Sequence, residues 1–444
     1  MKILSVYPWT HISSSALMIN GKLVSAAPEE RFNRKKWSTD FPILSANWCL
    51  KKNGIKWKDL DLIVVPWNPS YNINSASSRW DSNIRWRGEL LSNIPTNIMK
   101  AIRNKPSNSM QVSFGKTKIL YLNHHECHAA SAVFDSGFKK CDYLTIDGHG
   151  ESETCVSGYF NGTKFIKKNS IIYPHSVGLL YGTFTDFLGF RPDSDEWKTM
   201  ALASYSKKKN VYDNKMQKIY KLTKNGFELD LTYFAYYQFD KKPNFFSEKL
   251  VDLFGEPREK NFKILKKHYE IAGSLQRSFE KIVFHLLKIT KKTGGGSRNI
   301  IMAGGAAMNC VFNGLLNKDN TYKNNYIPPW PDDSGVSIGA TYLANSLYKK
   351  RTKTVAPCNV YLGPAYSNKL ILETIKKYNL NYYKPKNIFT DTALKLSNGK
   401  LIGWFQDSME FSHRALGNRS ILADPRKKNF KKKVNSAIKY RESF

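Results

Sequence analysis

The stretch NHHECHAASAVF, residues 123–134, concentrates side chains that can bind metal ions. His124 and His128 are four residues apart, so on a helix both imidazoles lie on one face, one turn apart. His125 points about 100° away from that pair. The zinc-protease motif HExxH is absent, because Ala129 stands where its second histidine would be. The spacing indicates a metal-binding pair, although it also suits a helix start whose histidines face solvent or cap the helix.

Further candidates stand at the ends of short apolar runs. Asp147 follows YLTI and opens a polar turn, where an acid can hold a cation and backbone N–H groups can approach phosphate. Gly304 and Gly305 follow NIIMA and precede a helical pattern, so a ligand can come close to the backbone there. Asp332 and Asp333 precede another helical pattern, where acids are ordinary capping residues.

The elements that position these residues follow a repeated pattern. The apolar run KILYL before the histidines predicts a strand that feeds a helix. The first thirty residues predict strands joined by a tight turn at Asn20-Gly21, and a similar layout recurs from Asp147 to a hairpin at Asn161-Gly162. This recurrence predicts an internal duplication of a unit that begins with β-strands, with two lobes around a nucleotide-binding cleft.

Composition limits the class of protein. A chain of 444 residues with 41% hydrophobic residues is long enough for two or three globular domains. The net charge of +33 comes mostly from lysines spread along the chain without a nucleic-acid motif, which argues against nucleic acid as a partner and favours anionic substrates. No apolar run approaches the ~20 residues of a membrane helix. We therefore expect no membrane span and a cytoplasmic protein; a homo-oligomer stays open.

The last quarter of the chain has a separate organisation. The basic, proline-containing run after Tyr348 predicts a linker, and a new unit begins near residue 357. We expect an N-terminal domain over 1–350, with lobes of about 1–140 and 141–350, and a C-terminal domain over 357–444. The unit has its own expected helix (NKLILETIKKY) and strand (KLIGWFQ). The sequence stops at an aromatic residue just after a charged helix, with no closing strand there, so we expect this domain to be incomplete.

Eight sequence blocks occur in a characteristic order along the chain: EERFNRKKW, HHECHAASAVF, LTIDGHGE, HSVGLLYGTFTDFLGF, DEWKTMALASY, AGGAAMNCVFNGLL, PDDSGVSIGA and MEFSHRALGNRSILADPR. Together they resemble one family, the O-carbamoyltransferases of the nodulation-protein U and tobramycin carbamoyltransferase type. The resemblance implies an α/β fold with duplicated actin/hexokinase-like (ribonuclease H-like) lobes, similar to the tRNA threonylcarbamoyl-transfer protein, followed by a partial YrdC-like α/β domain.

The resemblance implies roles for residues of this chain. A divalent metal, with Fe²⁺ as the first choice and Zn²⁺ or Mn²⁺ as alternatives, is expected between two histidines and two aspartates, with Asp332 as a substitute for the second acid. The expected metal ligands are His124, His128, Asp147 and Asp333. The expected catalytic residues are His11 as general base and Lys36 toward the carbonyl oxygen or phosphate. Nucleotide binding is expected at Gly304, Gly305, Asn309, Glu196 and Lys198. Carbamoyl-phosphate binding is expected at Arg414, Asn418, Arg419 and Arg426.

The implied activity is O-carbamoylation of a sugar or secondary-metabolite hydroxyl, using carbamoyl phosphate and ATP as co-substrates through carbamoyl-adenylate. The acceptor is a small molecule or a glycan. The chain departs from the family pattern at several positions: Ser408 replaces an arginine, Ser412-His413 replace Gly-Pro, and the usual YrdC-like continuation after RESF is missing. These departures leave a second hypothesis open, a nucleotide-binding protein that has lost turnover.

Overall fold

The computed structural model describes residues 1–8, 12–68, 109–114, 117–206, 209–238, 244–349, 359–439, 441–442 and 444. The chain divides into two compact units, Met1–Cys358 and Asn359–Phe444. Each is described separately below.

The first unit contains a six-stranded mixed sheet with the order β3-β2-β1-β4-β6-β5. The first three strands form an antiparallel meander, and β4 and β6 continue the sheet parallel to β1. Asn20 and Gly21 join β2 to β3 with φ values of 52° and 84°, the backbone that a two-residue hairpin turn requires. The predicted turn is therefore confirmed. The strands are β1 (Lys2–Tyr7), β2 (Ser14–Ile19), β3 (Lys22–Pro28), β4 (Leu62–Val65), β5 (Ser109–Phe114) and β6 (Thr117–Leu122).

A second mixed sheet repeats this topology with the order β13-β12-β7-β8-β9. Strands β7, β8 and β9 form an antiparallel meander, and β12 and β13 run parallel to β7. The predicted duplication of a β-first unit is thus present in the topology. The hairpin after β8 is longer than a two-residue turn, since residues 161–164 separate the strands and Asn161 Oδ1 accepts the N–H groups of Thr163 and Lys164. The strands are β7 (Cys141–Ile146), β8 (Glu153–Phe160), β9 (Phe165–Ile172), β12 (Asn299–Ala303) and β13 (Asn324–Tyr326).

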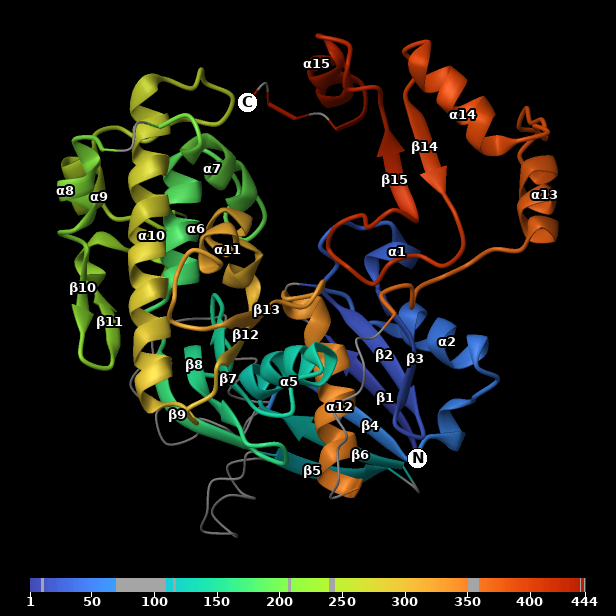
Figure 1. Ribbon diagram of the computed structural model, residues 1–444, viewed down its shortest axis with the longest axis horizontal. Coiled ribbons are helices and arrows are strands. Elements are labelled where there is room, and N and C mark those ends of the chain that lie inside the picture. The colour runs from blue at the N-terminus through green and yellow to red at the C-terminus, as the bar shows by residue number, and fades with distance from the viewer. Residues whose placement is uncertain are drawn as a thin grey trace. The chain divides into compact units, whose positions relative to one another are not determined.

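The helix that carries the two histidines packs closely against the helix that follows Asp333. Helix α5 (His124–Ser136) lies against α12 (Val336–Lys349), and α12 also packs on β1 and β2 (Figure 1). The contact requires glycine at position 339, because a Cβ there would lie 1.8 Å from the backbone carbonyl oxygen of Cys127. Gly339 thus lets the N-terminal turn of α12 lie directly against the N-terminal turn of α5.

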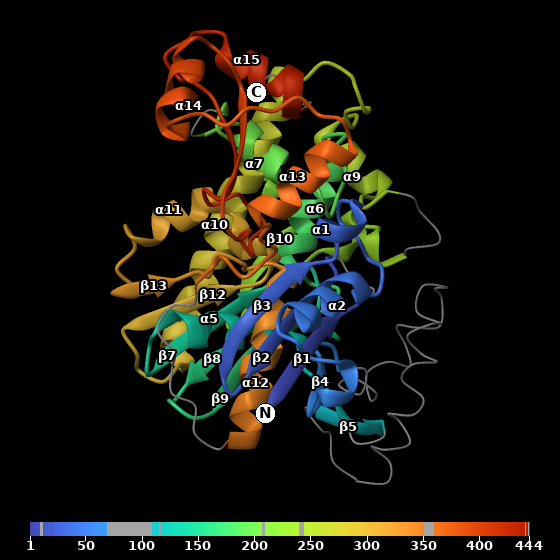
Figure 2. The same ribbon diagram turned by 90° about the vertical axis from the view of Figure 1, so that its right-hand side faces the viewer.

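Helices α2 and α10 pack against the sheets, and α10 also packs against other helices. Helix α2 (Ile43–Lys52) lies on β2 and β3 (Figure 2) and buries Cys49 and Leu50 in an apolar cluster with Leu4 and Leu17. The long helix α10 packs beside α6 and α7 (Figure 1). The other elements of the unit are α1 (Glu30–Asn33), α6 (Val177–Phe187), α7 (Glu196–Ala203), α8 (Tyr212–Met216), β10 (Tyr220–Thr223), β11 (Gly226–Leu229), α9 (Glu248–Phe254), α10 (Lys266–Thr293) and α11 (Cys310–Leu316).

The second unit is a small α/β assembly built around one two-stranded antiparallel sheet. A helix and a strand are present in this unit over Asn368–Lys377 and Ile402–Phe405. Neither α13 nor α14 has a buried residue. The elements are α13 (Asn368–Lys377), α14 (Ile388–Ser397), β14 (Ile402–Phe405), β15 (Arg419–Leu422) and α15 (Phe430–Val434). Among the described residues of the whole chain, no helix combines the length and apolar character needed to cross a bilayer.

Candidate metal centre

The first turn of α5 presents the histidine pair. The helix begins at His124, directly after β6, and the side-chain oxygen of Asn123 caps it by accepting the N–H of Glu126 at 2.9 Å. His124 and His128 are fully buried, and their Nε2 atoms lie 3.1 Å apart. The predicted strand–helix junction and the shared face of the two imidazoles are both present.

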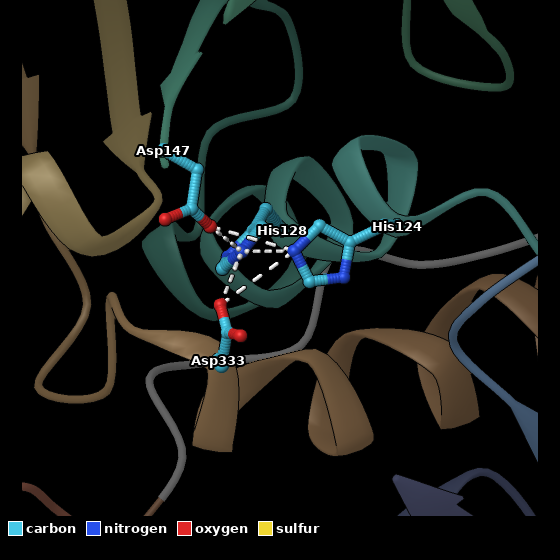
Figure 3. Close-up of side chains that lie close together, drawn as sticks. All are labelled: His124, His128, Asp147 and Asp333. Carbon is cyan, nitrogen blue, oxygen red and sulfur yellow. Dashed lines mark hydrogen bonds and ion pairs between the residues drawn. The ribbon is translucent and has the colours of Figure 1, made fainter. Parts of the chain in front are cut away.

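Two aspartates from distant parts of the chain complete the group (Figure 3). Asp147 directly follows β7, and its Oδ2 lies 2.9 Å from His128 Nε2 and 3.4 Å from His124 Nε2. Asp333 opens the 3₁₀ turn before α12, and its Oδ1 lies 3.4 Å from His128 Nε2 and 3.6 Å from His124 Nε2. One ligand atom from each side chain lies within 4.8 Å of all the others. Asp332, the alternative acid, accepts a hydrogen bond from Ser334 Oγ and is not part of this group.

The outer oxygen of each aspartate is held by the surrounding protein. Tyr7, at the end of β1, donates its hydroxyl to Asp333 Oδ2 at 2.8 Å, and its ring stacks on His124 with centroids 5.7 Å apart. Asp147 Oδ1 accepts the N–H groups of Gly148 at 2.8 Å and Gly305 at 3.2 Å. Both carboxylates therefore present one oxygen to the histidines, as expected when neighbouring groups orient metal ligands.

The charges in the group stabilise one another. Burial alone would lower the pKa of His124, but Asp147 and Asp333 raise it to about 10. Burial and Asp333 oppose ionisation of Asp147, yet its contacts with both histidines lower its pKa to about 2. His125 behaves differently, because burial lowers its pKa to about 4. Its ring nitrogens lie 2.9 Å from Thr145 Oγ1 and from the Glu153 carbonyl oxygen, so it is a neutral structural histidine.

The donor set and its spacing fit a divalent cation. Two ligand atoms at ~2.1 Å from one ion are about 3.0 Å apart at right angles and about 3.4 Å apart in a tetrahedron. The measured histidine–histidine and histidine–aspartate separations of 2.9–3.6 Å cover this range. Two imidazoles with two carboxylates suit a borderline divalent metal. The buried group of His124, His128, Asp147 and Asp333 is therefore able to hold a metal ion.

Metal binding to this group is expected to release protons. A metal ion needs the neutral imidazole, whereas the raised pKa of His124 keeps that ring protonated at pH 7 in the metal-free protein. Burial and His124 oppose protonation of His128, but its contacts with Asp147 and Asp333 raise its pKa as well. Calorimetry with Co²⁺ in buffers of different ionisation enthalpy should therefore show between one and two protons released per site, and the affinity should rise at least tenfold per pH unit between pH 6 and 8. The raised pKa of His124 also stabilises the metal-free fold below pH 6.5, and this contribution is lost as the pH rises toward 10. Metal binding without proton release would contradict this prediction.

The glycine loop after β12 lies beside Asp147. Gly304 has a φ of +94°, and a Cβ on it would lie 2.2 Å from the carbonyl oxygen of Ile146 in β7. Its N–H donates to the Pro331 carbonyl at 2.7 Å, and the next amide, Gly305, donates to Asp147 Oδ1. Glycine is required here so that two parallel strands and the loop can approach closely. The loop that was expected to bind nucleotide is thus joined directly to the metal group.

The other three residues expected to bind nucleotide have structural contacts. Asn309 caps α11 by accepting the N–H of Phe312 at 3.0 Å and exchanges amide hydrogen bonds of 2.9 and 3.1 Å with Gln276 of α10. Glu196 begins α7, and burial raises its pKa to about 8. Lys198 lies three residues after Asp195, and its Nζ is 3.3 Å from the Oδ2 of that aspartate.

Comparison with known proteins decides the family. Residues 2–342 match the family described as carbamoyltransferase N-terminus, and residues 393–444 match the family described as carbamoyltransferase C-terminus. The chain belongs to the carbamoyltransferase family. The predicted resemblance is confirmed, and the membership is that of a transferase.

Similar proteins include nodulation proteins. An uncharacterised Synechocystis protein is 35% identical, with 100% of this chain and 74% of the relative covered. Nodulation protein NolNO of Sinorhizobium fredii is 28% identical (98% and 61% covered), and nodulation protein NolO of Bradyrhizobium diazoefficiens is 32% identical (73% and 57% covered). The chain thus spans about three fifths of the length of these two nodulation proteins. Among solved structures, the activator of 2-hydroxyisocaproyl-CoA dehydratase from Clostridium difficile aligns at 13% identity and a TM-score of 0.41, covering 81% of this chain and all of that one.

The residues expected to bind carbamoyl phosphate lie in the second unit, and all four lie within residues 393–444, which match the family's C-terminus. Glu410 organises this region, because its buried Oε1 accepts the N–H groups of Leu416, Asn418 and Arg419 at 2.7–3.0 Å. The side chain of Asn418 donates to the Ser408 carbonyl at 2.9 Å. These contacts hold the carbamoyltransferase motif in a compact turn and carry Arg419 into β15.

The arginines of the second unit differ in their surroundings. Arg426 forms a two-pronged ion pair with Asp424, with nitrogen–oxygen distances of 2.7–3.1 Å, while its side chain remains 75% exposed. The pair holds the pKa of Asp424 at about 2. Arg414 lies on the exposed part of the turn, and its N–H donates to Ser412 Oγ at 3.3 Å.

The two residues expected to be catalytic are not both described. His11 lies outside the described residues. Lys36 is exposed after α1, with its Nζ 5.2 Å from the centroid of the Trp37 ring. Its catalytic role stays a prediction.

Sequence reasoning missed two residues that contact the metal group or the residues beside it. Tyr7 is the last residue of β1 and contacts Asp333, 326 residues away. The duplication was an available signal, since Tyr7 ends the first strand of one repeat and Asp147 follows the first strand of the other. Glu151 stands in the quoted block LTIDGHGE, yet its contacts with the first turn of α5 depend on tertiary packing.

Proposed function

We propose that this carbamoyltransferase uses carbamoyl phosphate and ATP to form carbamoyl-adenylate and then carbamoylates the hydroxyl of a sugar or secondary metabolite. The observation that carries the proposal is the group of His124, His128, Asp147 and Asp333, which converges in a chain of this family. Asp147 of this group accepts the N–H of Gly305, which belongs to a glycine loop that a ligand can approach closely. This contact supports a nucleotide site beside the metal.

Iron in the divalent state is our first choice of metal, with Zn²⁺ or Mn²⁺ as alternatives, because imidazole and carboxylate ligands suit all three. When bound, the cation would supply charge stabilisation for a leaving phosphate and polarisation of the carbamoyl carbonyl. The chain's own residues do the rest. Tyr7, Gly148 and Gly305 hold the outer carboxylate oxygens, and α5 and α12 exclude water from the imidazoles.

The transfer has two steps whose atoms balance. Carbamoyl phosphate, ATP and water give carbamoyl-adenylate, phosphate and pyrophosphate; we assign this step to a YrdC-like C-terminal domain, of which Arg414, Asn418, Arg419 and Arg426 would hold the phosphates. The acceptor hydroxyl oxygen then attacks the carbamoyl carbon, the bond to AMP breaks, and a base accepts the hydroxyl proton. His11 is the proposed base, since histidine titrates near neutral pH. Lys36 is proposed to face the developing negative charge.

Pyrophosphate release tests the proposal. The full chain with Fe²⁺ should release pyrophosphate from ATP only when carbamoyl phosphate is present, and a hydroxylated sugar acceptor should gain about 43 mass units, the CONH₂-for-H difference. Omitting carbamoyl phosphate is the control for pyrophosphate release, and omitting the metal is the control for the mass gain of the acceptor. ATP binding in a calorimeter without pyrophosphate release would instead favour the nucleotide-binding protein that lacks turnover.

A further inference from the structure

The loop between β7 and β8 carries Asp147 at its start and Glu151 near its end. The two oxygens of Glu151 reach across to the beginning of α5: Oε1 accepts the N–H of His124 at 2.9 Å, and Oε2 accepts the Asn123 side-chain N–H at 3.0 Å. His124 is the first residue of the helix, so its N–H has no partner within the helix. A carboxylate at this end is also favoured by the helix dipole.

A third segment meets the same carboxylate. The N–H of Asn68, just beyond β4, donates to Glu151 Oε1 at 2.8 Å. The adjacent Trp67 ring lies edge-on to His124 with centroids 5.5 Å apart. One side chain thus joins the Asp147 loop, the start of the histidine helix and the segment that packs on a histidine ring.

The position of this contact matters for the metal group. His128 Nε2 lies only 2.9 Å from Asp147 Oδ2, and metal–ligand distances tolerate changes of only about 0.2 Å. Sliding of α5 relative to the loop would change that separation directly. The group is therefore sensitive to whatever fixes the first turn of α5 against the loop.

We infer that Glu151 is a positioning residue for the metal centre, where its carboxylate sets the distance between the histidine pair and Asp147. This inference rests on the metal binding proposed above. The alternative explanation is that His125 fixes α5 against this loop, because its ring contacts Thr145 before the loop and the Glu153 carbonyl after it. If the contacts of His125 are sufficient, those of Glu151 are redundant for metal binding.

Substitution of Glu151 by glutamine separates these cases. An amide can accept the backbone N–H groups with its oxygen, but its NH₂ would then face the NH₂ of Asn123. Rotating Asn123 is costly, since its oxygen caps Glu126. We expect Glu151→Gln to raise the Kd for Co²⁺ by 10- to 100-fold, as for other groups that orient metal ligands. The cobalt absorption bands should shift as well. Measurements belong at pH 8, because burial raises the pKa of Glu151 to about 7.

Glu29 offers a matched control. Its buried carboxylate also accepts two N–H groups of a helix start, from Leu44 at 3.0 Å and Ser45 at 2.8 Å in α2. Glu29→Gln should lower the melting temperature comparably and leave the cobalt Kd and spectrum unchanged. Equal effects of the two variants on Kd, or no effect of either, would overturn the role of Glu151.

A second variant covers the case in which Glu151→Gln fails to fold. Asn123→Ser keeps a helix-capping oxygen but removes the donor to Glu151 Oε2. It should raise the cobalt Kd by about 3- to 10-fold, the lower part of the range for such partners; an unchanged Kd and spectrum would count against the inference. Should the wild-type chain bind no Co²⁺, the metal centre itself fails; should it bind normally while both variants match it, only the role of Glu151 fails.

Discussion

Replacing His128 with alanine is expected to abolish metal binding and carbamoyl transfer together. His128 is fully buried, and its Nε2 lies within 3.4 Å of His124, Asp147 and Asp333, so it is the most central of the four ligands. Loss of groups that merely orient ligands costs 10- to 100-fold in affinity, so loss of a ligand should cost about 1,000-fold. Titration with Co²⁺, the metal content of the purified protein and the mass gain of a sugar acceptor measure the effect.

The same substitution also changes the charge of the metal-free protein. Asp147 and Asp333 would share one imidazolium in place of two, so the melting temperature without metal should fall. His285→Ala is the matched control, because this histidine lies on α10 of the same unit and contacts the Thr223 carbonyl at 2.8 Å. If the two variants retain equal cobalt affinity, the four-residue group is not the metal site.

The metal group was readable from sequence for particular reasons. The pair His124 and His128 is local, since helical periodicity alone places both rings on one face. Asp147 and Asp333 were expected from the family resemblance, because no local pattern shows that the end of β7 meets the start of α12. That meeting depends on Gly339, whose missing side chain lets α12 approach the backbone of α5. A glycine inside a helical pattern does not reveal which neighbour it approaches.

Local residue types predicted one turn correctly but missed other features, for physical reasons. The hairpin turn at Asn20-Gly21 follows from two residues that tolerate positive φ. The loop at Asn161 carries a similar dipeptide but is longer, because the asparagine side chain binds two later N–H groups instead. The structural use of Asn309, which pairs with Gln276 of α10, is equally invisible in a motif, because a side-chain amide can serve a ligand or a neighbouring helix.

Gly304→Ala is expected to destabilise the first unit and loosen the metal group. An added Cβ would lie 2.2 Å from the Ile146 carbonyl oxygen, 2.6 Å from its carbonyl carbon, and the residue would keep an unfavourable φ of +94°. Strain of this kind costs about 1–3 kcal/mol, and overpacking against backbone adds a similar amount. We expect the free energy of unfolding of the unit to fall by about 3 kcal/mol, measured by urea denaturation.

The Gly304→Ala substitution should also weaken the binding of metal and nucleotide, because the loop of Gly304 and Gly305 is hydrogen-bonded to Asp147. Any shift that relieves the contact with β7 carries the Gly305 amide away from Asp147 Oδ1, so the affinities for Co²⁺ and ATP should fall together. Gly314→Ala in α11 is the matched control, since nothing lies within 4 Å of its added Cβ and alanine favours a helix. If Gly304→Ala matches this control in stability and in both affinities, close approach of the loop to β7 is not what couples the nucleotide loop to the metal group.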